Sequence, residues 1–129
     1  MAKKVLIVDD EPNIVAALDY LLRRSGYEVQ AAPDGEAALR LVQAEAPDLV
    51  LLDLMMPEKS GYEVCQRIRS HPEWSKIRIV ILSAKGREAD VSKGLSLGAD
   101  AYITKPFSNA ELVERIGALL AAEGAPGGA

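Results

Sequence analysis

Five short apolar runs alternate along the chain with longer segments in which apolar residues recur every three or four positions. Short runs that are rich in β-branched residues predict strands, and the longer repeats predict helices with one apolar face. The predicted strands are KVLIV (4–8), YEVQAA (27–32), the start of LVLLDLMMP (49–57), IRIVILSA (77–84) and AYIT (101–104).

Residues that typically begin or end helices stand between these runs. Pro12 suits the first turn of a helix, and Gly26 is placed to end the same helix. The fourth helix is predicted to end near Gly98. Ser108 stands three residues before Glu111, and this capping-box spacing predicts the start of the last helix.

The alternation of strands and helices predicts a single α/β domain. Consecutive parallel strands need a crossover helix between them, and strands that are apolar throughout fit a sheet covered on both faces. Right-handed crossovers then favour a doubly wound, five-stranded parallel sheet. We expect the domain to occupy residues 1–123, and residues 124–129 are predicted to be a flexible tail or the start of a linker because they contain nothing to bury.

Composition excludes several classes of protein. With 129 residues, 49% hydrophobic and 26% charged, the chain fits one globular domain with one core. The net charge of −4 argues against non-specific binding to nucleic acids or anionic membranes, and no apolar segment could span a bilayer. The single cysteine, Cys65, is predicted to be a buried helical residue, which fits a reducing compartment. We therefore expect a soluble, cytoplasmic protein.

The candidate chemistry lies where the predicted strands end. Asp9 and Asp10 follow the first strand, Asp53 ends the third, Ser83 lies at the end of the fourth and Lys105 follows the fifth. In open α/β sheets, ligands bind beyond the carboxyl ends of the strands. Three carboxylates, a hydroxyl group and an ammonium group are therefore predicted to meet there. A carboxylate at the end of the apolar run LVLLD is tolerable if a cation and the lysine compensate its charge.

This set of groups suits phosphoryl transfer. A small, partly open site with oxygen ligands favours Mg²⁺, which one of the first-strand acids, Asp53 and the carbonyl oxygen of Met55 would hold. Lys105 and Ser83 would then face the remaining phosphoryl oxygens. In this arrangement Asp53 is the nucleophile.

At these positions the chain resembles the receiver domain of bacterial two-component response regulators, over about residues 3–122. The motifs that carry the resemblance are VLIVDDEP, DLVLLDLMMP followed by SGYEVC, VILSA and AYITKPF. Each motif alone is weak, but together, in this order and one at each strand end, they are specific. The resemblance implies a flavodoxin-like (βα)5 fold with strand order 2-1-3-4-5.

The resemblance also implies roles for the strand-end residues. Asp53 would be phosphorylated by a histidine kinase or a phosphotransfer protein, with Lys105 and Ser83 assisting. Mg²⁺ would bind Asp10, Asp53 and the backbone carbonyl of Met55, with Asp9 close by. The peptide bond between Lys105 and Pro106 is usually cis in this family.

A conformational switch is implied as well. Ser83 would shift toward the phosphoryl group and Tyr102 would turn inward, although both residues also fit ordinary turn or core positions. The surface of the predicted fourth helix, fifth strand and fifth helix would then change for a downstream effector protein or an output domain. A phosphorylation-dependent homodimer is compatible with this scheme, whereas direct contact of this domain with nucleic acid or membrane is not expected. Such a domain promotes only its own phosphorylation and dephosphorylation, so we do not expect an enzyme.

Two features depart from the commonest pattern of that family. Serine replaces threonine at position 83, and the hydroxyl group that remains should preserve switching. Met55 and Lys85 occupy positions that tune the lifetime of the phosphorylated form. Because the side chain of Met55 cannot orient water, we predict slow self-dephosphorylation.

Two other classes of protein share parts of this pattern. A phosphatase of the haloacid dehalogenase type also uses Mg²⁺ and a strand-end aspartate, and Glu11 follows Asp9 at its spacing, but the expected threonine and cap domain are missing. A flavodoxin-like binding module would need a phosphate loop after the first strand, and DDEPN has the opposite charge. His71 and Trp74 are predicted to lie in a surface loop at the end of the third helix.

Overall fold

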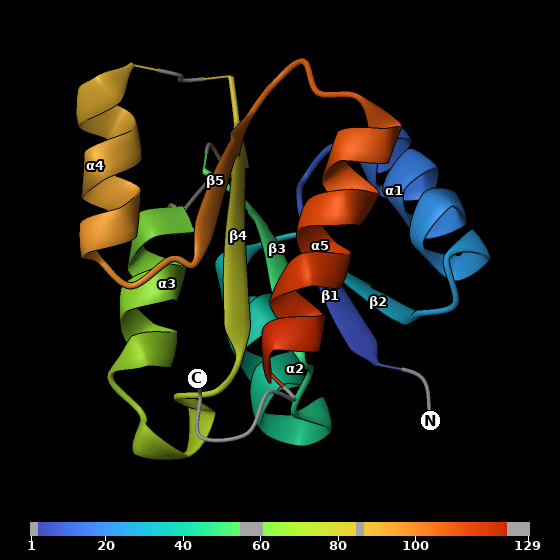
Figure 1. Cartoon of the computed structure of the whole chain (residues 1–129). Coiled ribbons are helices and arrows are strands. Elements are labelled where there is room, and N and C mark those ends of the chain that lie inside the picture. Colours follow the sequence, from blue (N-terminus) through green and yellow to red (C-terminus); the bar gives the residue numbers. More distant parts are fainter. Residues whose placement is uncertain (1–2, 55–60, 85–86, 124–129) are drawn as a thin grey trace.

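In the computed structural model, residues 3–54, 61–84 and 87–123 are described, and they form a three-layer α/β domain (Figure 1). The strands are β1 (Lys4–Val8), β2 (Glu28–Ala32), β3 (Leu49–Asp53), β4 (Arg78–Ser83) and β5 (Ala101–Thr104). The helices are α1 (Pro12–Arg24), α2 (Gly35–Glu45), α3 (Gly61–Arg69), the short 3₁₀ helix η1 (Pro72–Trp74), α4 (Glu88–Ser96) and α5 (Asn109–Glu123).

The five strands form one parallel sheet in the order β2-β1-β3-β4-β5. This order confirms the doubly wound, flavodoxin-like fold expected from the sequence. Because β1 and β3 are the inner neighbours from which the chain winds in both directions, the carboxyl ends of β1 and β3 flank the switch point of the topology. None of the helices in the three described ranges is long and apolar enough to cross a bilayer.

Side chains alternate between two cores, one on each face of the sheet. On one face, Val5, Leu51 and Leu82 pack with buried residues of α1 and α5; on the other, Leu6, Leu52 and Ile81 pack with α2 and α3. Figure 1 shows α1 and α5 together on one side of the sheet and α3 and α4 on the other. Because both faces of the sheet are covered, the strands are apolar at nearly every position.

Helix ends follow the predicted signals. Pro12 occupies the first turn of α1, and Gly26 follows that helix with φ of +97°, a conformation that glycine adopts without strain. The hydroxyl group of Ser108 accepts a hydrogen bond of 3.0 Å from the amide of Glu111, as the capping-box spacing predicts. The tail predicted for residues 124–129 lies outside the described residues.

Candidate functional site

The predicted side chains meet at the carboxyl ends of four adjacent strands, β1, β3, β4 and β5. Asp9 follows β1, Asp53 ends β3, Ser83 ends β4 and Lys105 follows β5. Asp9, Asp53 and Ser83 are buried, with relative exposures of 3%, 5% and 0%. These are the only buried polar or charged residues in the described part of the chain, so burial of polar groups is concentrated here.

Three carboxylates form a compact group at these strand ends. One oxygen atom from each of Asp9, Asp10 and Asp53 lies within 4.8 Å of the other two, with Asp10 exposed and the other two buried. The Nζ atom of Lys105 lies 3.8 Å from Oδ2 of Asp9 and 3.8 Å from Oδ1 of Asp53. The ammonium group therefore stands between the two buried carboxylates.

Backbone hydrogen bonds hold these residues in place. The amide of Lys105 donates to the carbonyl oxygen of Ser83 at 2.8 Å, which fixes the end of β5 against the end of β4. The amide of Asp9 donates to the carbonyl oxygen of Ala32 at 3.1 Å. The peptide bond between Lys105 and Pro106 is cis, as the resemblance implied.

Burial raises the pKa of Asp9 above its ordinary value. The amide of Glu11, which donates to Oδ1 of Asp9 at 2.9 Å, and the charge of Lys105 act in the opposite direction, while the charges of Glu11 and Asp10 raise the pKa further. Burial thus makes the negative charge of Asp9 costly despite the nearby ammonium group. A divalent cation beside these oxygen atoms would compensate it, and carboxylate oxygens are the ligands that Mg²⁺ prefers.

The sequence analysis did not predict one close contact, which lies between α3 and β3. A Cβ atom at Gly61 would lie 2.7 Å from the carbonyl oxygen of Asp53 and 2.9 Å from the Cα atom of Leu54, so only glycine fits. The amide of Gly61 also donates to the carbonyl oxygen of Leu54 at 3.2 Å. The first turn of α3 is thus seated on the backbone of the predicted nucleophile, and a glycine at the start of the third helix was the signal for it.

The two predicted switch residues lie on neighbouring strands. Ser83 is fully buried at the end of β4, opposite Thr104 of β5. Tyr102 is half-buried and packs against the core cluster that lies between the sheet and α2 and α3. Met55 and Lys85, predicted to supply a metal ligand and to tune the reaction rate, lie outside the described residues.

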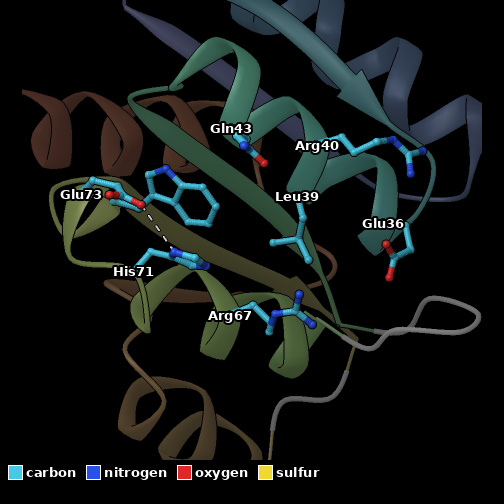
Figure 2. A pocket seen from close by; sticks show the side chains of 8 residues that line it. Glu36, Leu39, Arg40, Gln43, Arg67, His71 and Glu73 are labelled. Carbon is cyan, nitrogen blue, oxygen red and sulfur yellow. Dashed lines mark ion pairs between the residues drawn. The ribbon is translucent and has the colours of Figure 1, made fainter.

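A second concave region is unrelated to the strand ends. A hollow of about 530 Å³ lies between α2 and the segment from α3 to η1 (Figure 2). His71 lines it, with Nδ1 3.5 Å from Oε1 of Glu73 and its ring centroid 4.1 Å from that of Trp74. His71 and Trp74 follow the end of α3, as predicted, but Trp74 belongs to the 3₁₀ helix η1 and not to a loop. Cys65 is buried in α3, and burial raises its pKa to about 11, so its thiol group is poorly suited to act as a nucleophile.

The family model of the response regulator receiver domain matches residues 5–117. The chain belongs to this family. Receiver domains generally bind Mg²⁺ at an acidic site, and Asp9, Asp10 and Asp53 form such a group here. Because the chain belongs to the receiver family, its function is phosphorylation-based signalling, and the phosphatase and the flavodoxin-like binding module are not supported.

Several relatives are similar over nearly the whole receiver. The alkaline phosphatase synthesis transcriptional regulatory protein PhoP of Bacillus subtilis (strain 168) is 49% identical over 120 residues, which is 93% of this chain and 49% of PhoP. The chain therefore spans about half the length of this curated relative. The chemotaxis response regulator CheY4 of Vibrio cholerae has a TM-score of 0.87 at 28% identity, covering 92% of this chain and 99% of CheY4.

A third relative was solved with a beryllofluoride group. The BeF3-activated N-terminal receiver domain of RstA from Klebsiella pneumoniae has a TM-score of 0.86 at 30% identity. The match covers 92% of this chain and 98% of the RstA domain. This receiver fold is therefore similar to one solved in a form described as activated.

Proposed function

We propose that Asp53 accepts a phosphoryl group from a histidine kinase or phosphotransfer protein. The observation that carries the proposal is the position of Lys105, whose Nζ atom lies 3.8 Å from both Asp9 and Asp53. An ammonium group beside a buried carboxylate can stabilise the charge of an incoming phosphoryl group. Asp53 is 5% exposed and lies at the carboxyl end of β3, where ligands of such sheets bind.

Asp10, Asp53 and the Met55 carbonyl, with Asp9 close by, would hold Mg²⁺. The close group of carboxylates supports this assignment, because one oxygen atom from each of the three lies within 4.8 Å of the other two, and burial, which raises the pKa of Asp9, adds to the cost of its charge. When bound, the ion supplies charge neutralisation for the phosphoryl oxygens.

In the transfer step, a carboxylate oxygen of Asp53 attacks the phosphorus atom of a phosphorylated histidine. An oxygen–phosphorus bond forms while the nitrogen–phosphorus bond breaks, and the histidine nitrogen keeps the electron pair of the broken bond. Lys105 holds one phosphoryl oxygen, and the hydroxyl group of Ser83 donates a hydrogen bond to another. The product is an aspartyl phosphate that water later hydrolyses.

The new phosphoryl group would bias a two-state element, because it adds negative charge and new hydrogen-bond acceptors next to Ser83. Ser83 shifts toward it and Tyr102 turns inward, which changes the surface made by α4, β5 and α5. That surface then controls a downstream effector, an output domain or a homodimer partner. The name of PhoP makes regulation of transcription a candidate output. A cytoplasmic location stays a prediction.

Beryllofluoride with Mg²⁺ tests this proposal by NMR, since it forms a stable mimic of the acyl phosphate. We expect amide shifts at Asp53, Ser83, Tyr102 and along α4, and none of them in Asp53→Asn. Asp19→Asn, which changes a carboxylate on the surface of α1 that pairs with Arg23, is the matched control and should respond like the wild type. Equal responses in Asp53→Asn and the wild type would refute the assignment.

A further inference from the structure

Tyr62, in the first turn of α3, interacts with α4 and β5, two of the three elements whose surface the proposed switch changes. Its hydroxyl group donates a hydrogen bond of 3.2 Å to the backbone carbonyl oxygen of Asp90 in α4. The Nζ atom of Lys93, also in α4, lies 4.4 Å from the centroid of the Tyr62 ring. The sequence analysis assigned no role to this residue.

Tyr62 also interacts with Tyr102. Burial raises the pKa of Tyr62 most, and the charges of Tyr102 and Asp90 and a side-chain hydrogen bond with Tyr102 raise it further. The ring of Tyr102 is also close to α4, because a Cβ atom at Gly94 would lie 3.1 Å from its Cδ2 atom and 2.9 Å from Cδ1 of Ile81. Three elements therefore meet at one pair of phenol groups.

The close approach of Tyr102 to Gly94 and the packing of both tyrosines against one core cluster place the Tyr102 side chain on the face of the sheet that α3 and α4 cover. Tyr102 lies on β5, the edge strand of the sheet, whereas Tyr62 belongs to α3, which packs over more central strands. Tyr102 nevertheless packs against the same core cluster as Tyr62.

The backbone next to Tyr62 is tied to the phosphoacceptor strand. Gly61 is in contact with the carbonyl oxygen of Asp53, and its amide donates to the carbonyl oxygen of Leu54. Tyr62 is thus one residue away from the point at which α3 is anchored on β3. The backbone from which the Tyr62 side chain extends is therefore anchored next to Asp53.

We infer that Tyr62 is a positioning residue of the switch, whose hydroxyl group holds Tyr102 in its inward orientation and fixes the first turn of α4 beside it. This inference rests on the proposed function, since it concerns the equilibrium that phosphorylation of Asp53 biases. The amount of ligand needed for activation depends on how much of the active state the protein populates without ligand. Without the hydroxyl group of Tyr62, the inward orientation is less populated and activation requires more ligand.

The experiment is a beryllofluoride titration in the presence of Mg²⁺, followed through the amide resonance of Gly94. For Tyr62→Phe, we expect the half-maximal concentration to rise about two- to tenfold, the factor that the net loss of one neutral hydrogen bond gives. Tyr102→Phe removes the other partner and should shift the midpoint in the same direction. Tyr20→Phe is the matched control, because Tyr20 is 66% exposed on α1 and should titrate like the wild type.

The double variant separates positioning from a general structural effect. If Tyr62 acts through Tyr102, the Tyr62→Phe substitution shifts the midpoint less in the Tyr102→Phe variant than in the wild type. Fully additive shifts would overturn the inference, as would a Tyr62→Phe midpoint at or below that of the wild type. Failure of the proposed function would look different, because the wild type itself would then not respond, or Asp53→Asn would respond equally.

Discussion

Asp9 and Asp53 are buried carboxylates that share the ammonium group of Lys105 as an ion-pair partner. Buried charge is costly unless it is paired, and Asp10 adds a third negative charge within the same 4.8 Å group. On the proposed function, Asp53 accepts the phosphoryl group, and the cost of the clustered negative charge would favour binding of a cation.

Magnesium binding should consequently stabilise the folded chain. Because the folded state binds the ion and the unfolded state does not, a concentration of one hundred times the dissociation constant adds about 2.7 kcal/mol to the free energy of unfolding. We expect Asp10→Asn to lose most of this gain and Asp19→Asn to keep it. Urea unfolding with and without Mg²⁺ measures both, and an equal gain in Asp10→Asn would contradict the assignment.

At this scale the sequence predicted identities better than environments. The residues Asp9, Asp10, Asp53, Ser83 and Lys105 could be found because each stands at the end of a strand. The burial of Asp53 was anticipated from the apolar run before it. Only the fold shows that Asp9 is buried while Asp10 is exposed, because neighbouring residues at a strand end point in different directions.

Among the elements, α3 is the one whose position most directly affects the site. Its first residue, Gly61, approaches the carbonyl oxygen of Asp53 too closely for any side chain. A contact of this kind transmits the position of the strand end to the helix. The proposed role of Tyr62 depends on it.

Gly61→Ala should therefore destabilise the protein by about 1–3 kcal/mol, the usual cost of inserting a methyl group into a tightly packed place. Gly117→Ala in α5 is the matched control, because its nearest neighbour would be the hydroxyl oxygen of Tyr27 at 3.8 Å, an ordinary contact. Alanine there should instead stabilise the helix by about 0.5–1 kcal/mol. Urea midpoints compare the two variants, and an unchanged midpoint for Gly61→Ala would show that α3 can shift away from β3.

Element boundaries were predictable because proline, glycine and capping residues act locally, as Pro12, Gly26 and Ser108 do here. Contacts between elements were not. The side chain of Arg69 donates at 2.8 Å to both the carbonyl oxygen of Gly98 and Oδ2 of Asp100, joining the end of α3 to the connection between α4 and β5. No local sequence pattern predicts a contact between residues about thirty positions apart, because such a contact depends on how α3 and α4 pack on the sheet.

At the scale of the whole molecule, the topology of the sheet brings the side chains of the candidate site together. A parallel sheet in the order β2-β1-β3-β4-β5 places the carboxyl ends of four neighbouring strands at one edge, while helices cover both faces. Residues that lie up to 96 positions apart, Asp9 and Lys105, thus come within 3.8 Å. The doubly wound parallel sheet was predictable from the alternation of strands and helices. The order of its strands was implied only by the resemblance to receiver domains.

The central claim is that this assembly makes Asp53 the phosphoacceptor, and peptide mass spectrometry after treatment with acetyl phosphate and Mg²⁺ tests it most directly. We expect one phosphoryl group per chain, located on the peptide that contains Asp53 and sensitive to hydroxylamine as an acyl phosphate is. Asp53→Asn should remain unlabelled. A phosphoryl group at another residue, or equal labelling of Asp53→Asn, would contradict the account.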